Sequence, residues 1–476
     1  MVARAGSRPE TPLGRVCSQS APTPVLREED GMSKRSRGEA ARLRRVNPHA
    51  AGIDVGSASH WVAVDPSLTD QPVREFAAYT GDLHAMADWL IEHGVTTVAM
   101  EATGVYWVAA YEVLRDRGLE ACLVDARATK QVAGRKSDVS DCQWLQELHS
   151  YGLLKQAFFP GAEIGTLRCY MRQRERWIAD AGRAIQHMQQ ALELMNVKLT
   201  EVVADITGST GMAIIDGILA GQRDPQRLSE HRHPTCTRSR EEIARALEGN
   251  WRAEHLFALE QARGHFRYLG ERIVACDARL EEVLRACSTS EAEPPGGGKR
   301  DRSPHRFAFD ARGHCFRMAG VDLTTIDGVA VNTVLTVVSE VGVDMAPWRS
   351  ERAFGSWLGL APNRRKSGGR LLSSHTRPNA QRAATALRLA ARSLKDSKSA
   401  LGAFYRRLRA RIGAPKAITA TAYKIAKLFY RMLKTRRPYH DLGQAAYDER
   451  FRARRLRSLT RMAKELGFRL VAAEAT

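Results

Sequence analysis

The order of apolar segments between residues 50 and 150 constrains the fold of this chain more than any other feature. Short runs rich in Val, Ile and Ala alternate with segments whose apolar residues recur at helical spacing, which is typical of an α/β domain. Strands are expected at both ends of 50–65, around a tight Gly/Ser turn, and at 72–79, 96–100 and 119–126. Helices are expected at about 82–93, at 106–117 and from about residue 140.

Three antiparallel-type strands followed by alternating helix and strand predict a ribonuclease H-like α/β fold, with its active edge where strands end. Carboxylates occupy such positions. Asp54 lies on the first strand, and Glu101 ends the strand at 96–100. Asp138 and Asp141 are three residues apart, one helical turn, so both can face the same way. Because Mg²⁺ prefers carboxylate oxygens, and phosphoryl transfer needs cations at the attacking and leaving oxygens, we expect these four residues to bind two Mg²⁺ ions.

Three other carboxylates compete for these roles. Asp65 is expected in a turn and Glu147 in solvent, whereas Asp125 stays a candidate ligand because it ends the strand before the site. Residues 52–57 also have a rival interpretation, since actin-like sugar kinases and chaperone ATPases hold phosphate with a similar strand–turn–strand segment. Those proteins need a second Asp-Gly-Gly phosphate loop and an adenosine motif, and neither is found in this sequence. We therefore favour the metal site.

The chain is strongly basic, with 73 Lys and Arg residues against 53 Asp and Glu residues and a net charge of +20. Such an excess implies a polyanionic partner, most often nucleic acid. An anionic membrane surface would suit the same charge, but no run of 18 or more apolar residues predicts a membrane span. We expect a cytoplasmic protein that has no membrane partner.

The eight cysteines are scattered along the chain, and none forms a CxxC pair. We expect reduced thiols rather than disulfides or a zinc site. His231, His233 and Cys236 could bind a metal, although a polar loop around Pro234 is the favoured interpretation.

Composition divides the rest of the chain into further parts. Two helical stretches, at about 161–203 and 239–286, predict an antiparallel arm that serves either as a spacer or as a dimerisation or nucleic-acid-gripping element. A segment dense in Pro, Gly and charge predicts a linker. The expected parts are a disordered basic extension (1–48), the α/β catalytic domain (49–160), a helical coiled-coil arm (161–287), the linker (288–316), a mainly α-helical C-terminal domain (317–440) and a basic helical tail (441–476).

A basic loop in the C-terminal domain holds the candidate nucleophile, Ser367. Cations before it would neutralise a phosphate and favour a charged nucleophile, and glycines after it would let the backbone approach the phosphate. The residues expected to contact nucleic acid here are Arg364, Arg365, Lys366, Gly368 and Gly369. A loop serine bonded to its own backbone is the alternative for Ser367, and Ser373 and Ser374 are candidates of lower rank.

Two more patterns in this domain suggest contacts with nucleic acid. Residues 326–330, between two helices, have the character of a helix-hairpin-helix turn, which aims backbone N–H groups at a phosphate. Ala330 stands where a second glycine is common, and a plain interhelical turn is an equal alternative. Aromatic residues and cations also mix on the later helices, where Arg406, Arg407 and Lys424 are expected phosphate contacts.

Six motifs occur in order within roughly residues 48–440: GIDVGSASHWVAV, AMEATGVYW, GRKSDVSDCQWLQELHSYGLL, DITGSTGMAIIDGILAGQRDP, GVDLTTIDGV and LGLAPNRRKSGG. Together they resemble the DEDD transposases of a bacterial insertion-sequence family, which pair a RuvC-like domain with a serine-bearing transposase domain. The resemblance implies that Asp54, Glu101, Asp138 and Asp141 are the metal-binding tetrad. It also implies that Ser367 attacks a DNA phosphodiester and forms a phosphoserine link.

The resemblance further implies partners and an assembly. Members of that family recombine donor and target DNA under the guidance of a structured non-coding bridge RNA, and they act as homodimers that pair into tetramers. Because the tetrad and Ser367 lie in different expected domains, the active site must be composite. We expect an RNA-guided DNA transposase in the bacterial cytoplasm, associated with the nucleoid. Two alternatives stay open: a RuvC-type metal-dependent junction nuclease in which water attacks, and a non-catalytic nucleic-acid-binding relic.

Overall fold

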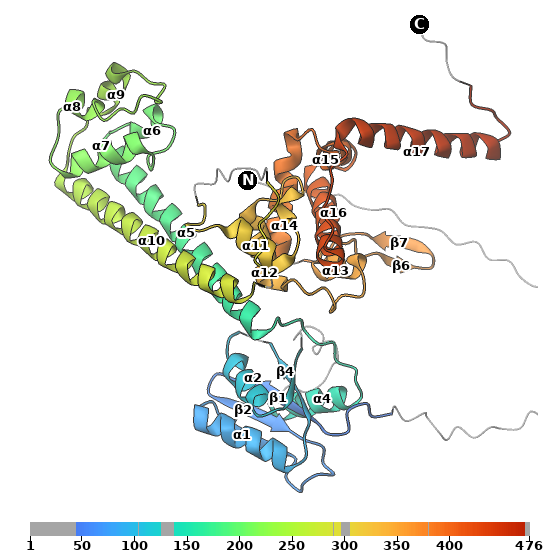
Figure 1. Cartoon of the computed structure of the whole chain (residues 1–476). Coiled ribbons are helices and arrows are strands. Elements are labelled where there is room, and N and C mark those ends of the chain that lie inside the picture. The colour runs from blue at the N-terminus through green and yellow to red at the C-terminus, as the bar shows by residue number, and fades with distance from the viewer. Residues whose placement is uncertain are drawn as a thin grey trace, which may run out of the picture. The chain divides into compact units, whose positions relative to one another are not determined.

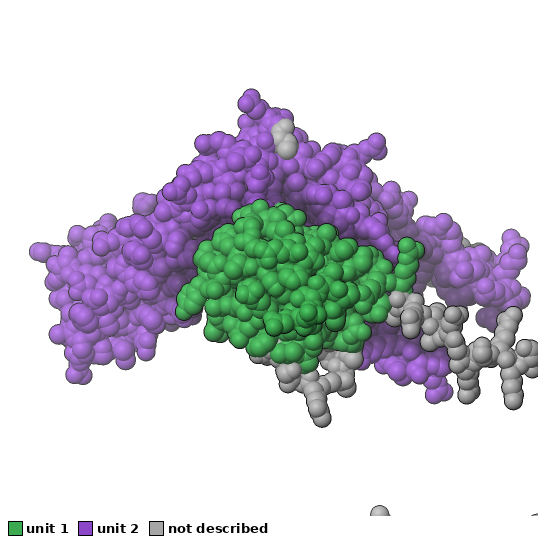
Figure 2. All heavy atoms as spheres, turned by 90° about the horizontal axis from the view of Figure 1, so that it is seen from below, with its two compact units in different colours: residues 1–157 green, residues 158–476 purple. Residues whose placement is uncertain are grey.

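The computed structural model describes residues 44–102, 104–124, 138–288, 290–296, 305–378 and 380–471, and for Asp138 it gives the backbone alone. Most of the predicted extension at 1–48 and the alternative ligand Asp125 lie outside the described residues. Contacts divide the chain into two compact units, Met1–Ala157 and Phe158–Thr476 (Figure 2). Within the described ranges, the helices are all too short or too polar to cross a membrane.

The first unit is built on a five-stranded mixed sheet (Figure 1). Its strands are β1 (Ala50–Val55), β2 (Ser59–Ala63), β3 (Val73–Ala77), β4 (Thr97–Glu101) and β5 (Glu120–Val124), in the order β3-β2-β1-β4-β5. The β1–β2 and β2–β3 pairs are antiparallel, whereas the β1–β4 and β4–β5 pairs are parallel. The described helices are α1 (Thr80–Glu92), α2 (Trp107–Asp116) and α4 (Asp138–Ser150). The predicted order of strands and helices is confirmed.

The central strand of this sheet is buried on both faces, which explains its apolar sequence. α4 covers one face so closely that Gly52 of β1 has no room for a Cβ atom. Side chains alternate along a strand, so Ala51 and Ile53 point to the opposite face. Both are fully buried, and the second face is therefore covered as well.

In the second unit, two long helices form an antiparallel arm (Figure 1). They are α5 (Ala162–Leu194) and α10 (Ala253–Ala286). The Sγ of Cys276 lies 3.3 Å from the carbonyl oxygen of Tyr170, and Asn250, just before α10, bonds to the carbonyl oxygen of Leu194 at the end of α5. Four short helices close that end over an apolar core: α6 (Leu199–Val202), α7 (Ser209–Leu219), α8 (Pro225–Ser229) and α9 (Arg240–Ala246).

The second helical stretch, predicted at 239–286, is two helices rather than one. α9 ends at Ala246 and α10 begins at Ala253. Between them, Trp251 has a φ of 47°, in the left-handed region. A side chain with positive φ does not fit a continuous right-handed helix, so the helix must stop before this residue.

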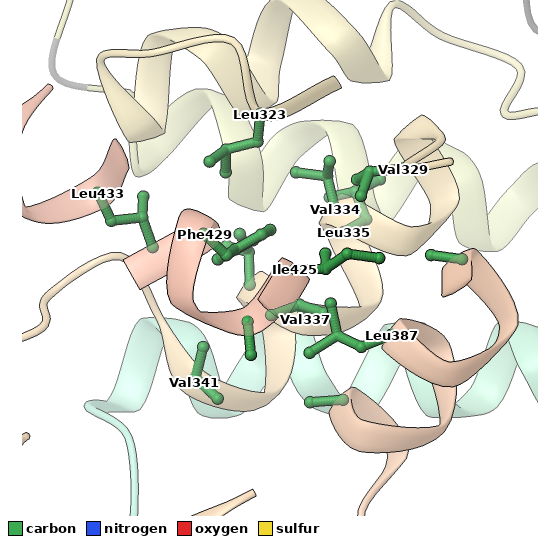
Figure 3. Packing of buried hydrophobic residues seen from close by; sticks show 14 of the residues in the cluster. Leu323, Val329, Val334, Leu335, Val337, Val341, Leu387, Ile425, Phe429 and Leu433 are labelled. Atoms are coloured by element: carbon green, nitrogen blue, oxygen red, sulfur yellow. The ribbon is translucent and has the colours of Figure 1, made fainter. Parts of the chain in front are cut away.

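The rest of the second unit is a helical body around one apolar core (Figure 3). Its described elements are α11 (Ala311–Ala319), η1 (Leu323–Thr325), α12 (Val331–Val341), α13 (Glu351–Trp357), β6 (Arg365–Ser367), β7 (Arg370–Ser373), α14 (Arg382–Ser393), η2 (Leu394–Asp396), α15 (Ala400–Ile412), α16 (Ala414–Thr435) and α17 (Gly443–Glu465). In the core, Val334 and Leu335 of α12 join Leu387 of α14 and Ile425 and Phe429 of α16. The tail from 441 is helical, as predicted.

The end of the predicted linker, 288–316, is folded against the arm and contains the start of α11. Arg174 of α5 forms a buried ion pair with Asp277 of α10, and Arg174 Nη2 donates to the carbonyl oxygen of His305 at 3.0 Å. Asp277 Oδ2 accepts a hydrogen bond from Ala308 N–H at 3.0 Å. Composition alone could not predict that this segment folds against the arm, because Arg174 and Asp277 come from helices that are distant in sequence. The other domain boundaries stay predictions.

Candidate functional site

Asp54 and Glu101 lie near the carboxyl ends of two adjacent parallel strands. Ile53 of β1 pairs with Met100 of β4, and each carboxylate is the next residue on its strand. Both side chains are partly buried. Since neighbouring strands are about 4.8 Å apart, the two carboxylates start from backbone positions close enough to share one cation.

α4 brings Asp141 to the same part of the unit. The helix packs on β1 at Gly52, where an added Cβ would lie 2.4 Å from the carbonyl oxygen of Cys142. Burial raises the pKa of the Cys142 thiol to about 12, and the negative charges of Asp54 and Asp141 both add to this rise. Asp54 and Asp141 therefore belong to the two elements that pack together at Gly52, β1 and α4.

The fourth predicted ligand, Asp138, is the first residue of α4, and its side chain lies outside the described residues. Among the side chains that are described, no group of three or more His, Cys, Asp or Glu residues is gathered closely enough to hold a metal ion. The chemistry of the donor set fits Mg²⁺, because carboxylate oxygens are hard ligands and Asp54, Glu101 and Asp141 stand on adjoining elements.

Two competing carboxylates have the surroundings that the sequence predicted. Asp65 is buried in a turn, where its Oδ1 accepts hydrogen bonds from Ser67 N–H at 3.0 Å and Ser67 Oγ at 2.8 Å. Burial alone would raise the pKa of Asp65, but these hydrogen bonds and the charge of Arg45 hold it below its ordinary value. Glu147 is exposed on α4.

The loop that contains His231, His233 and Cys236 is held by its own hydrogen bonds. Cys236 N–H donates to the carbonyl oxygen of His233 at 2.9 Å, and His233 Nδ1 bonds to Thr235 Oγ1 at 2.8 Å. All three residues belong to the described part of the chain, in which no metal-binding group was found. These hydrogen bonds agree with the polar-loop interpretation, which stays a prediction.

The segment around Ser367 is a β-hairpin, not the basic loop that we predicted. β6 and β7 pair antiparallel, with Ser367 opposite Arg370. Between them, Gly368 and Gly369 have φ values of 52° and 76°. Two consecutive positive φ values define a tight hairpin turn whose twist matches that of the strands, and glycine adopts them at little steric cost. Gly368 and Gly369 therefore form the turn, a role that differs from the phosphate approach expected of them.

The hairpin adds Arg370 to the candidate site. Residues directly opposite each other in an antiparallel pair project from the same face, so Arg370 lies beside Ser367. Both side chains are exposed. The predicted nucleic-acid contacts of this segment are exposed as well: Arg364, Arg365, Lys366, Gly368 and Gly369. Two short runs separated by Gly-Gly are a hairpin signal, and that signal could have identified Arg370 from the sequence.

The two serines of lower rank follow on β7 and beyond it. Ser373 is partly buried and pairs with Arg365, and its Oγ accepts a hydrogen bond from His375 N–H at 3.3 Å. Ser374 is exposed but lies past the end of the strand. Ser367 is the serine next to the turn, and its role as nucleophile stays a prediction.

Three predicted phosphate contacts have partners inside the protein. Arg406 donates to Gln444 Oε1 at 2.8 Å, and the Arg407 guanidinium lies 3.5 Å from the ring centroid of Phe451. Burial lowers the pKa of Lys424 on α16. Gln444 and Phe451 both belong to α17, so Arg406 and Arg407 anchor the start of this helix. Contact of the three cations with nucleic acid stays a prediction.

The predicted helix-hairpin-helix turn, residues 326–330, connects η1 to α12. Gly328 has a φ of 81°, and an added Cβ would lie 2.6 Å from the carbonyl oxygen of Ala390 in α14. Val329 N–H donates to the carbonyl oxygen of Ile326 at 3.0 Å, inside the turn. The turn is therefore packed against the helical body, and its contact with phosphate stays a prediction.

Two sequence profiles of known families match the chain. Residues 51–197 match a transposase profile, the DEDD transposase domain of IS110, and residues 322–406 match the transposase family IS116/IS110/IS902. The first match contains all four predicted metal ligands, and the second contains the hairpin with Ser367. No curated protein was found to match the chain.

Both profiles describe transposases, and the first describes the DEDD class, whose ribonuclease H-like domain agrees with the mixed sheet of the first unit. The protein is thus a DEDD transposase, an enzyme of DNA recombination. More particularly, the chain belongs to the IS110 family of insertion-sequence transposases, which confirms the resemblance found in its motifs.

Proposed function

We propose that this transposase exchanges DNA strands through a covalent link to Ser367, assisted by Mg²⁺ at the four carboxylates. The observation that carries the proposal is the placement of Ser367 at the exposed end of β6, opposite Arg370 and directly after three cations. A hydroxyl in that position is accessible to a phosphodiester, and the positive charge around it attracts phosphate.

In the proposed step, Ser367 Oγ attacks the phosphorus atom of a DNA phosphodiester. The Oγ–P bond forms while the bond from phosphorus to the 3′ oxygen breaks, and the serine proton passes through solvent to the departing 3′ oxygen. The 3′ hydroxyl of another strand then attacks the phosphoserine: its oxygen bonds to phosphorus, the Oγ–P bond breaks, and its proton passes through solvent to Ser367 Oγ. One ester bond forms for each that breaks, so the exchange needs no external energy source.

The charged residues would have separate roles in this reaction. Asp54, Glu101, Asp138 and Asp141 would hold Mg²⁺, which when bound neutralises charge at a reacting phosphate. Arg370 would stabilise the negative charge that develops on the phosphoryl oxygens, because a guanidinium donates two hydrogen bonds to such a group. A cation beside the Ser367 hydroxyl also favours its ionised form.

A structured guide RNA and an oligomeric assembly are further parts of the proposal. The net charge of +20 supports binding to RNA as well as to donor and target DNA. Guidance by a bridge RNA, and homodimers that pair into tetramers, are what the family resemblance implies. Sequencing the RNA that copurifies with the protein, and comparing it with the flanks of its gene, tests the RNA part directly.

Recombination between donor and target plasmids tests the chemistry. Ser367→Ala and Asp54→Ala should each lower recombination by at least about 100-fold, as expected when a nucleophile or metal ligand is lost. Ser374→Ala is the matched control, because it removes an exposed hydroxyl from the same segment. Strand cleavage that survives Ser367→Ala would favour the junction nuclease. If the unmodified protein binds nucleic acid without metal and does not cleave it, the result would favour a non-catalytic nucleic-acid-binding protein.

A further inference from the structure

The C-terminal helix α17 extends from the helical body with none of its 23 residues buried (Figure 1). Its first turns are anchored to α15: Arg407 pairs with Asp448 at 2.7 Å, and the rings of Phe404 and Tyr447 meet edge to face. A helix of this length that buries no side chain gains little from packing. The surface beyond the anchored turns is therefore available to a partner.

Five cations form a stripe along one face of α17. They are spaced by four, three, four and three residues, at which side chains line up along a helix. This cation stripe consists of Arg450, Arg454, Arg457, Arg461 and Lys464. All five are exposed, and the ion pair of Arg461 with Glu465, at 3.8 Å, is exposed as well. With a rise of about 1.5 Å per residue, the stripe is roughly 21 Å long.

The opposite face of α17 is apolar. Leu456, Leu459 and Met462 are 52%, 42% and 52% exposed, and helical spacing places them away from the stripe. Arg452 and Arg455 are also exposed and lie on this apolar side by the same spacing. Because most cations of α17 are gathered on one face, they can meet a polyanion together.

We propose that the cation stripe of α17 binds the phosphate backbone of duplex DNA. Duplex DNA carries one negative charge per about 1.7 Å of its axis, so the stripe would face roughly a dozen phosphates. Four of its five cations are arginines, whose guanidinium groups bind phosphate through paired hydrogen bonds. An α-helix enters the major groove of DNA, whereas the major groove of an RNA duplex is too narrow, and this difference favours DNA over RNA.

This inference deepens the proposed function, on which it rests for the choice of DNA as partner. α17 begins at Gly443, beyond the end of the second family match at residue 406. The stripe is therefore a DNA-contact surface in addition to the hairpin, on a part of the chain that neither family profile covers. Its role is to hold DNA, and no step of strand exchange depends on it.

Binding of the full-length protein to a labelled duplex of about 30 base pairs, measured over a range of salt concentrations without Mg²⁺, tests the stripe. The double variant Arg457→Gln/Arg461→Gln should lower the slope of log K against log salt by about 1.8, and weaken binding about 10- to 30-fold near 0.15 M salt. The matched control is Arg452→Gln/Arg455→Gln, which removes the same charge from the other face of the same helix and should change binding less than about 3-fold.

A second comparison separates charge from helix structure. Arg457→Lys/Arg461→Lys keeps both charges and should bind DNA within about 3-fold of the unmodified protein. Equal losses in the two glutamine variants, or no loss in either, would overturn the proposal. So would a selective loss of binding to an RNA duplex, or to vesicles containing phosphatidylserine, while DNA binding is unchanged. Ser367→Ala should bind as tightly as the unmodified protein, so failure of the serine chemistry stays distinguishable from failure of the stripe.

Discussion

Gly52 of β1 faces the carbonyl oxygen of Cys142 in α4 with no space for a side chain between them. A Cβ at Gly52 would lie 2.4 Å from that oxygen and 2.3 Å from the backbone nitrogen of Gln146. Because both are backbone atoms of a helix, neither can move without the whole of α4. This contact fixes the helix that carries Asp141 against the strand that carries Asp54, and so sets the spacing of the candidate metal ligands.

Gly52→Ala should therefore damage both stability and recombination. Overpacking at such a contact costs about 1–3 kcal/mol, and the displaced α4 would move Asp141 away from Asp54. Thermal unfolding and plasmid recombination measure the two effects. The control is Gly81→Ala in α1, where an added Cβ meets no atom within 4 Å, and there stability should be unchanged or slightly higher. A Gly52→Ala protein as stable and active as the unmodified one would contradict this account of the contact.

Removing one member of the Arg174–Asp277 ion pair should lower the free energy of unfolding strongly. Replacing both members with apolar residues should cost less than the sum of the two single changes. Both side chains are 2% exposed, and removing one leaves the other as an unpaired buried charge. Arg174→Met is expected to lower the free energy of unfolding by about 3–5 kcal/mol, and Arg174→Met with Asp277→Leu by less than the sum of the single changes. Denaturant unfolding of the single and double variants gives the coupling. Additive losses would show that the pair does not act as a unit.

Arg279→Met is the matched control for the ion pair. It lies on the same helix as Asp277, and its contact with Glu282 is exposed. An exposed pair is largely screened by water, so no measurable loss of stability is expected.

The sequence was sufficient to predict the α/β order of the first unit but not the contacts that hold the second. Apolar runs report burial directly, which is why the five strands follow the predicted segments. The hairpin at Ser367 was missed because the two glycines after it were assigned to phosphate approach rather than to a turn. The roles of Arg407 and Lys424 could not be predicted, since burial and ring contacts depend on how α15, α16 and α17 pack.

The first unit should lose stability as the pH falls through about 6.5. Burial lowers the pKa of His60 and of His149 in the folded protein, and the hydrogen bond with the Ser59 backbone and the charge of Glu120 oppose this in part. In the unfolded chain both imidazoles take up a proton near pH 6.5. The unfolded state then binds more protons, so the stability present above that pH is lost below it, by up to about 1.4 kcal/mol per pH unit and per histidine.

Thermal unfolding between pH 8 and pH 5 measures this dependence. His149→Gln should flatten it, because glutamine does not titrate in this range. His84→Gln, which replaces an exposed histidine in the same unit, should leave the pH profile unchanged. A profile that is equally steep in all three proteins would assign the pH dependence to other groups.

The turn at Gly368 should tolerate Asn but not Val. Its φ of 52° is readily adopted by glycine and asparagine, whereas a β-branched residue would be strained by about 1–2 kcal/mol. No atom lies within 4 Å of an added Cβ, so the difference between the two variants isolates the backbone effect. Recombination should stay within about 3-fold for Gly368→Asn and fall about 10-fold or more for Gly368→Val, since that strain would open the turn beside Ser367. Equal rates would show that the turn does not position the serine.

The central claim, that Ser367 forms a covalent bond with DNA, is tested most directly by trapping that bond. The protein, its copurifying RNA, Mg²⁺ and labelled DNA would be mixed and denatured during the reaction, and the modified peptide identified by mass spectrometry. We predict a DNA phosphate on Ser367, absent from Ser367→Ala and strongly reduced in Asp54→Asn. DNA cleavage without any protein–DNA adduct, or an adduct on Ser373 or Ser374, would contradict the assignment.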